Sequence, residues 1–236
     1  MSTLRYRYQT IEFGNLTIEF GNLDIHLRTL RNRQEYSDDD GVAARLGIHS
    51  SNWSLYGVVW ASGEMLARLM LEEHEIEGKR ILEVGCGIGL ASLVLNRRDA
   101  DITATDYHPN AEAFLEENTR LNNGRKIPFV RTGWGDELTE LGKFDLIIGC
   151  DLVYEYDQAE LLASFVDQHA KPRCMVLILD PGRIHHRRFS NSMIERGYSH
   201  QQGTPDDVRT LTQPLRGSDK FQVHRYTRCC RDAAII

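Results

Sequence analysis

The sequence predicts an α/β protein with a mostly parallel sheet and helices on both of its faces. Between residues 80 and 180, short apolar runs typical of buried strands alternate with amphipathic, helix-like stretches. The first apolar run, 80–84, leads directly into glycines at every second position, Gly85, Gly87 and Gly89, and then into a stretch with apolar residues three and four apart. This order predicts a buried strand, a tight turn and a helix, and the remaining elements are arranged around it.

Size, charge and cysteine content limit the class of protein. A chain of 236 residues can bury a large core, and its net charge of −6 argues against a nucleic-acid binder held by phosphate contacts. The five cysteines show no C-x-x-C spacing and indicate free thiols in a reducing compartment. The sequence begins without an apolar signal region, and none of its stretches approaches about 18 apolar residues, so we expect a cytoplasmic protein without membrane association.

A seven-residue segment, TIEFGNL, occurs twice in succession at 10–16 and 17–23. Each copy alternates apolar and polar residues and then presents Gly-Asn, which suits a two-residue hairpin turn. We therefore predict a small β meander with strands near 8–13, 16–20 and 23–30, within an N-terminal extension of residues 1–47. A tandem duplication without functional consequence is the alternative.

Residues 48–236 are predicted to form the main domain, and one strand near its C-terminus is expected to be antiparallel. The expected strands lie near 80–84, 102–106, 127–131, 144–150, 174–179 and 221–226, with a weak strand in the polar segment 198–220. Helices occupy the intervals between them. Ser62 is expected to cap one helix, and Asp157 with Glu160 is expected to form a variant of the capping box at another.

The spacing of the glycine loop indicates which ligand it holds. A dinucleotide fingerprint requires a glycine or alanine five residues after the first glycine, and Leu90 occupies that position. The loop also lacks the Lys-Ser/Thr pair of a phosphate-binding P-loop. Glu83 precedes the loop, and Asp106 ends the next strand-like run 21 positions after Gly85, where doubly wound folds bind ribose hydroxyls. Because Leu90 breaks the dinucleotide fingerprint, a nicotinamide-dependent oxidoreductase is disfavoured.

Three groups of residues carry a resemblance to a known family. Residues 83–89, Asp106 and Asp151-Leu152-Val153-Tyr154 resemble motifs of the seven-stranded S-adenosylmethionine-dependent methyltransferases. The DxxY motif at 151–154 is similar to that of the protein-lysine methyltransferase branch. Asp180-Pro181-Gly182-Arg183 further resembles the subgroup acting on the electron-transfer flavoprotein β-subunit. Over roughly residues 53–228, the resemblance implies a Rossmann-like seven-stranded methyltransferase sheet and S-adenosylmethionine as the cofactor.

The implied cofactor site combines acids, glycine backbone and aromatic residues. S-adenosylmethionine carries an ammonium and a ribose diol but no phosphate, so Glu83 is expected to hold the ammonium and Asp106 the ribose. The expected cofactor-binding residues are Trp60, Glu83, Gly85, Cys86, Gly87, Asp106, Tyr107, Trp134 and Cys150. A core tryptophan without a cofactor contact is the alternative for Trp60, and a packed turn is the alternative for Trp134.

Asp151 and Tyr154 are the expected catalytic residues. Methyl transfer is an in-line displacement in which alignment provides much of the catalysis, and a lysine acceptor must first lose a proton. Asp151 is expected to orient the amine, and Tyr154 to wall the channel and contact the cationic product face-on. A helix-capping acid and a core tyrosine are the alternative for this pair.

The run from Arg183 to Arg188 is basic in an otherwise acidic chain. It is either a solvated face or a docking surface for an acidic protein partner. The adjacent His185 and His186 point apart on any regular element, so no metal site is expected, and Cys229 and Cys230 are taken as ordinary thiols. We expect methyl transfer to a lysine side chain of a protein. A small-molecule methyltransferase and a non-catalytic cofactor-binding scaffold are the alternatives, and the oligomeric state is not predicted.

Overall fold

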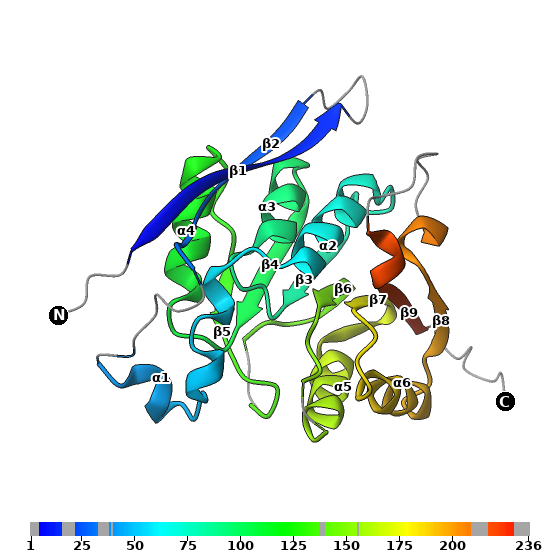
Figure 1. Ribbon diagram of the computed structural model, residues 1–236. Coiled ribbons are helices and arrows are strands. Elements are labelled where there is room, and N and C mark those ends of the chain that lie inside the picture. Colours follow the sequence, from blue (N-terminus) through cyan, green and yellow to red (C-terminus); the bar gives the residue numbers. More distant parts are fainter. Residues whose placement is uncertain are drawn as a thin grey trace, which may run out of the picture.

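The computed structural model describes residues 5–15, 22–32, 38, 40–136, 140–154, 156–208 and 217–228. Within these ranges the chain forms a two-stranded sheet and a seven-stranded sheet, whose strand order is β5-β4-β3-β6-β7-β9-β8 (Figure 1). The large sheet contains β3 (Arg80–Val84), β4 (Asp101–Asp106), β5 (Phe129–Arg131), β6 (Phe144–Cys150), β7 (Ala170–Asp180), β8 (Ser199–Gly203) and β9 (Gln222–Arg228).

The large sheet is parallel from β5 to β7, and β9 pairs antiparallel with both of its neighbours, β7 and β8. The predicted fold class is thereby confirmed, including the single antiparallel strand near the C-terminus. β8 is the weak strand expected in the polar segment 198–220. β7 begins four residues earlier than predicted, at Ala170, because Ala170 pairs with Phe144 of β6 across an irregularity in the ladder.

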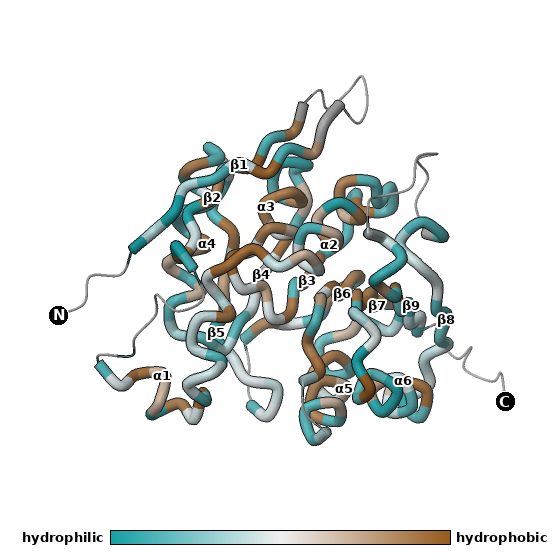
Figure 2. The backbone as a smooth tube through the Cα atoms, in the orientation of Figure 1, coloured by the Kyte–Doolittle hydropathy of each residue, from teal (hydrophilic) through white to brown (hydrophobic). Residues whose placement is uncertain are grey.

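Helices cover both faces of this sheet (Figure 1). Side chains alternate along a strand, so Ile81 of β3 packs on one face while its neighbour Leu82 packs on the other. The first face is covered by α2 (Ala61–Glu72), α3 (Leu90–Arg97) and α4 (Ala111–Leu121), and the second by α5 (Gln158–His169) and α6 (His186–Glu195). The central strands are accordingly apolar along most of their length (Figure 2), as expected for parallel strands buried on both faces.

The N-terminal strands β1 (Tyr6–Asn15) and β2 (Asn22–Leu30) form an antiparallel hairpin outside the large sheet. Its ladder runs from Tyr6 opposite Leu30 to Asn15 opposite Asn22. The predicted turn at the first Gly-Asn is therefore wrong, because β1 continues through these residues and pairs directly with β2. The predicted middle strand, 16–20, lies outside the described residues.

The hairpin is fixed to the main domain by packing and by hydrogen bonds. Ile25 and Leu27 of β2 are fully buried in the core cluster that contains α3 and α4. Two side chains at α4 pair with the backbone of β2: Asn122 accepts from His26 N–H at 2.8 Å, and Asn118 accepts from Arg28 N–H at 2.7 Å. These amides satisfy backbone groups on the edge of β2 that faces the helix.

Two predicted helix caps are wrong. α2 begins at Ala61, so the buried Ser62 lies inside its first turn, and Trp60 is the residue that precedes the helix. Asp157 does precede α5, but its side chain makes no capping hydrogen bond because its backbone is already helical (φ −76°, ψ −23°), whereas a capping side chain needs an extended residue. Glu160 pairs with Ser192 and Arg196 of α6 instead.

Candidate active site

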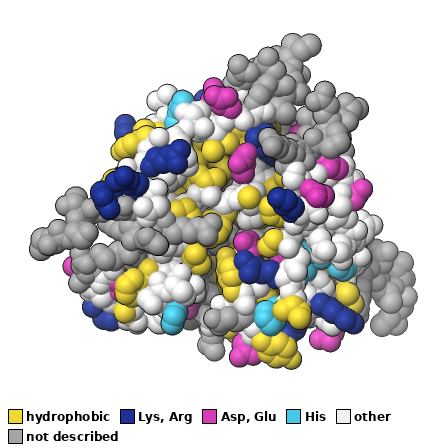
Figure 3. All heavy atoms as spheres, viewed as in Figure 1, with side chains coloured by type: hydrophobic (Ala, Val, Ile, Leu, Met, Phe, Trp, Pro, Cys, Tyr) yellow, Lys and Arg dark blue, Asp and Glu magenta, His cyan; other side chains and the backbone are white. Residues whose placement is uncertain are grey.

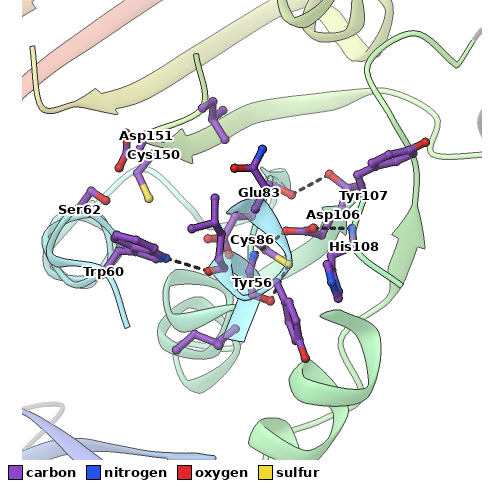
Figure 4. Close-up of a pocket in the computed structure, with 18 of the residues that line it drawn as sticks. Tyr56, Trp60, Ser62, Glu83, Cys86, Asp106, Tyr107, His108, Cys150 and Asp151 are labelled. Carbon is purple, nitrogen blue, oxygen red and sulfur yellow. Dashed lines mark hydrogen bonds between the residues drawn. The ribbon is translucent and has the colours of Figure 1, made fainter. Parts of the chain in front are cut away.

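A cavity of about 390 Å³ opens at the carboxyl ends of the parallel strands. Its walls include the loops that follow β3, β4, β5 and β6, together with residues 48–63 from the segment that leads into α2. Open α/β sheets bind ligands at this edge. All of the predicted cofactor-binding residues and both predicted catalytic residues line the cavity, so the structure brings the whole predicted set together. Figure 4 labels several of them, among them Trp60, Glu83 and Asp106.

The glycine loop presents bare backbone to this cavity. Gly85 and Gly87 have φ values of +64° and +55°, a region that favours glycine. A Cβ at Gly85 would lie 2.6 Å from Leu152 Cδ2, and a Cβ at Gly87 would lie 3.2 Å from the carbonyl oxygen of Tyr56. The loop therefore tolerates no side chain at either position without rearrangement of its neighbours.

Asp106, at the end of β4, holds the glycine loop in place. One carboxylate oxygen accepts from Gly87 N–H at 2.8 Å, and the other accepts from His108 N–H at 2.8 Å. Burial raises the pKa of Asp106, and these backbone hydrogen bonds oppose that shift. Each carboxylate oxygen can accept a further hydrogen bond, so the group remains available to a ligand.

Glu83 is the second acid of the site and is buried, with 4% of its surface exposed. One carboxylate oxygen accepts from the backbone N–H of Ser92 at 2.9 Å and also from the Ser92 hydroxyl, in the first turn of α3. Burial raises the pKa of Glu83 to about 7, and the neighbouring Asp106 adds to the shift. A cation bound at Glu83 would stabilise the ionised form and lower this pKa.

Aromatic and thiol side chains complete the wall. Figure 4 shows two groups of side chains on opposite sides of the end of β3 and the glycine loop. One group is Trp60, Ser62, Cys150 and Asp151, and the other is Asp106, Tyr107 and His108. The indole of Trp60 donates to the carbonyl of Leu55 at 2.8 Å, and the Tyr107 hydroxyl donates to the carbonyl of Leu46 at 2.7 Å. Burial raises the pKa of both Cys86 and Cys150, so both thiols stay protonated and act as packing groups.

Asp151, Tyr154 and Arg183 form one cluster at the mouth of the cavity. Arg183 Nε donates to the Asp151 carboxylate, and its guanidinium carbon lies 4.6 Å from the centre of the Tyr154 ring. Tyr154 is 44% exposed, so it is not a core tyrosine. The Asp151 carboxylate pairs with Arg183 rather than capping a helix. The alternative roles considered for this pair are therefore wrong.

Comparison with known proteins identifies the family. A profile described as lysine methyltransferase matches residues 44–194, which is more than half of the chain. The chain belongs to the lysine methyltransferase family.

Two curated relatives show what the chain is similar to in sequence. The chain is 31% identical over 147 residues to the electron transfer flavoprotein beta subunit lysine methyltransferase of Xenopus laevis, covering 61% of this chain and 56% of the relative. It is 32% identical over 138 residues to a protein N-lysine methyltransferase of Danio rerio, covering 55% of this chain and 63% of the relative. The chain thus spans less than two thirds of the length of these relatives.

The fold is also that of magnesium protoporphyrin IX methyltransferase from Synechocystis with bound S-adenosylmethionine. The TM-score is 0.57 at 16% identity, and the match covers 81% of this chain and 98% of that one. At this identity the likeness concerns the fold alone.

The residues that line the cavity fit S-adenosylmethionine. The site offers two acids, the buried Glu83 and the half-buried Asp106, whose carboxylates can accept hydrogen bonds from ammonium and hydroxyl groups, and a glycine loop with no room for side chains. It offers no cluster of basic side chains for a phosphate: the cavity wall contains no lysine or arginine among the described residues. The described residues also contain no group of three or more potential metal ligands. None of the helices formed by these residues is long and apolar enough to cross a membrane.

Two residues of the site are not predicted from the sequence. His108 stacks on Tyr56 with ring centres 3.8 Å apart, and burial lowers the pKa of His108 to about 4, which keeps it neutral. In the sequence it precedes Pro109 and indicates only a helix start. The sequence places Arg183 in the Asp180–Arg183 motif and in the basic run 183–188, but no sequence pattern signals its pairing with Asp151, 32 positions earlier.

Proposed function

We propose that this protein transfers a methyl group from S-adenosylmethionine to the side-chain amine of a lysine in another protein. The observation that carries the proposal is the placement of Asp151 and Tyr154 in the wall of the cavity that also contains Glu83, Asp106 and the glycine loop. Membership of the lysine methyltransferase family supports the same reaction.

The cofactor is assigned to the β3–β4 side of the cavity. Glu83 binds the ammonium, and Asp106 accepts from the ribose hydroxyls through the lone pairs that its two backbone hydrogen bonds leave free. The backbone of Gly85 and Gly87 lies against the methionine part, and Trp134 covers the adenine. When bound, S-adenosylmethionine supplies an activated methyl group on a sulfonium.

The acceptor is assigned to the β6–β7 side. Asp151 accepts a hydrogen bond from the amine and so fixes its direction, while the ring of Tyr154 walls the channel and faces the cationic product. Alignment of this kind accounts for much of the rate of an in-line transfer. Neither residue needs to act as a strong base, provided that the amine arrives without its extra proton.

The surface around the mouth favours a protein as the acceptor. Four large apolar side chains are exposed there or beside it: Tyr154, Tyr156, Leu161 and Ile184, the last one 85% exposed. The basic run 183–188 lies in the same region, where arginine, histidine and apolar side chains are mixed on the surface over α5 and α6 (Figure 3). We propose that this run attracts an acidic surface of the acceptor. The name of the Xenopus laevis relative gives a flavoprotein subunit as its substrate, and this is the first candidate for the acceptor here.

We also propose a cytoplasmic location. Cys86, Cys150 and Cys174 are all free thiols in the described part of the chain, as expected for a protein in a reducing compartment. Separate assays of cytosolic and organelle fractions for the protein would test this placement.

The experiment that tests the function uses radiolabelled S-adenosylmethionine and a cell extract separated by size. We expect label on the protein fraction, and more of it at low than at high salt, because screening acts over about 8–10 Å at ordinary ionic strength. Label confined to small molecules would overturn the protein acceptor in favour of a small-molecule methyltransferase. No label at all, with intact cofactor binding, would indicate a non-catalytic scaffold. Protein label that is independent of salt would leave the acceptor but remove the role of the basic run.

A further inference from the structure

Arg183 contacts both proposed catalytic residues from outside the cavity. Its Nε donates to Asp151, and its guanidinium lies over the Tyr154 ring. Asp151 and Tyr154 line the cavity, whereas Arg183 is absent from its described wall. The arginine therefore contacts the two side chains that an acceptor would meet without lining the cavity itself.

The turn that carries Arg183 is held in place by the side chain of Asp180. Asp180, at the end of β7, is 1% exposed, and one of its carboxylate oxygens accepts from Gly182 N–H at 2.7 Å and from Arg183 N–H at 2.6 Å. Gly182 has a φ of +86°, which completes the tight turn. The backbone that carries the guanidinium is thus held by a buried acid at the end of β7.

The charge of Arg183 matters because of the chemistry of the acceptor. A lysine amine has a pKa of about 10.4 in water and reacts only when neutral. An unpaired carboxylate beside it would favour the ammonium and raise that pKa further. A guanidinium is always charged in proteins, so its ion pair with Asp151 leaves a carboxylate that accepts a hydrogen bond without adding a net negative charge.

The other ionisable groups around this pair do not replace the arginine. Tyr154 and Cys150 remain neutral because burial raises the pKa of each. Asp180 acts electrostatically on Arg183, Asp106 acts on Tyr154, and Glu83 acts on Cys150; all three are acidic. Arg183 supplies a positive charge in direct contact with both Asp151 and Tyr154.

We propose that Arg183 is a positioning residue which offsets the charge of Asp151, so that the acceptor lysine loses its proton when it binds there. This inference rests on the proposed function. The ammonium releases its proton to solvent water at the open mouth, and the amine lone pair then forms the new N–C bond as the S–C bond of the donor breaks.

The test is the pH dependence of methyl transfer by Arg183→Gln, which keeps hydrogen-bonding groups and removes the charge. Initial rates of protein labelling in cell extract are measured with labelled S-adenosylmethionine between about pH 6 and pH 10.5, a range that brackets the pKa of lysine. We expect the midpoint of the pH–rate profile to rise by about one unit or more. The rate near neutral pH then falls about tenfold and recovers in alkali.

Two variants serve as controls. Arg183→Lys retains the charge and should retain the wild-type midpoint. Arg187→Gln makes the same change in net charge four residues away, at an exposed arginine with no ion pair to Asp151, and should also leave the midpoint unchanged. Affinity for S-adenosylhomocysteine, measured by calorimetry, should be unchanged in all three variants because these residues do not line the cavity.

The outcomes separate this inference from the proposed function. If the wild-type protein labels no protein, the proposed function fails and the inference fails with it. If the wild type labels protein but Arg183→Gln keeps the wild-type midpoint, with its rate either unchanged or reduced equally at every pH, the proposed function stands and the role given to Arg183 is wrong.

Discussion

The two sides of the cavity are held together in different ways. On the β3–β4 side, Asp106 and Glu83 are fixed mainly by backbone N–H groups of nearby segments. On the β6–β7 side, Asp151 and Tyr154 are fixed by the side chain of Arg183, which comes from another strand end. Under the proposed function, the side fixed by backbone groups receives the cofactor, and the side fixed by a side chain receives the acceptor.

The largest expected effect concerns Asp106, on the β3–β4 side of the cavity. Asp106→Ala removes the acceptor for Gly87 N–H and His108 N–H as well as the proposed ribose contact. Charged hydrogen bonds are worth about 1.5–3 kcal/mol each, so the affinity for S-adenosylhomocysteine should fall by more than about 100-fold, as measured by calorimetry. An affinity within a few-fold of the wild type would show that the glycine loop holds its shape and its ligand without this acid.

The next largest effect is expected at Asp151, on the β6–β7 side of the cavity. Asp151→Asn should lower the rate of protein methylation by about ten- to 100-fold, because the amine loses one charged hydrogen bond. Cofactor affinity should change little, since Asp151 contacts Arg183 and not the glycine loop. A labelling assay paired with calorimetry measures both quantities on the same preparation. Equal losses of rate and affinity would contradict the division into two sides.

A smaller effect follows from the raised pKa of Glu83, which burial brings from 4.5 to about 7. If Glu83 binds the cofactor's ammonium as a carboxylate, the affinity for S-adenosylhomocysteine should rise by about tenfold from pH 6 to pH 8. In Glu83→Gln this rise should disappear. A pH-independent affinity in the wild type would mean that the ammonium is bound elsewhere.

The same group affects stability with the opposite sign. Because the folded protein binds the Glu83 proton more tightly than the unfolded chain does, this contribution to the free energy of unfolding is present in full below about pH 4.5 and is lost as pH rises through about 7. Thermal unfolding in the absence of ligand, followed across this window, should therefore show a decline that is weaker in Glu83→Gln. A decline of equal size in both proteins would assign it to other groups.

The smallest effect is expected at the start of α5, on the acceptor side. Replacing a working N-cap acid by alanine costs about 0.5–2 kcal/mol, but Asp157 makes no capping hydrogen bond. Asp157→Ala should thus change the free energy of unfolding by less than about 0.5 kcal/mol, as measured by denaturant titration. A loss above about 1 kcal/mol, the size typical of a working cap, would restore the capping role that the sequence suggests.

The same contrast explains what sequence reasoning could and could not predict. Glu83, the glycine loop and Asp106 belong to two consecutive strand ends, so local pattern and spacing place them together. The pairing of Arg183 with Asp151 depends on β7 lying beside β6 and on a turn tied down by Asp180. Neither contact leaves a periodic signal in the sequence.

The wrong predictions have a related cause. The Gly-Asn pair of β1 suits a turn by composition, but β1 includes both residues, and Asn15 pairs with Asn22 of β2 after an irregularity in the ladder. Asp157 and Glu160 have the spacing of a cap, but the ion pair of Glu160 with Arg196, at the end of α6, is a tertiary contact that the local pattern does not reveal. In each case a contact distant in sequence overrode a local preference.

The most direct test of the account is peptide mass spectrometry of cell-extract proteins after incubation with methyl-deuterated S-adenosylmethionine. The wild type, Asp106→Ala and Asp151→Asn are compared, with S-adenosylhomocysteine affinity measured for each. We predict deuterated methyl-lysine with the wild type and strongly reduced methyl-lysine with both variants, of which only Asp106→Ala loses ligand affinity. Wild-type methyl-lysine formation by Asp151→Asn, or deuterium on an acceptor other than lysine, would contradict the account.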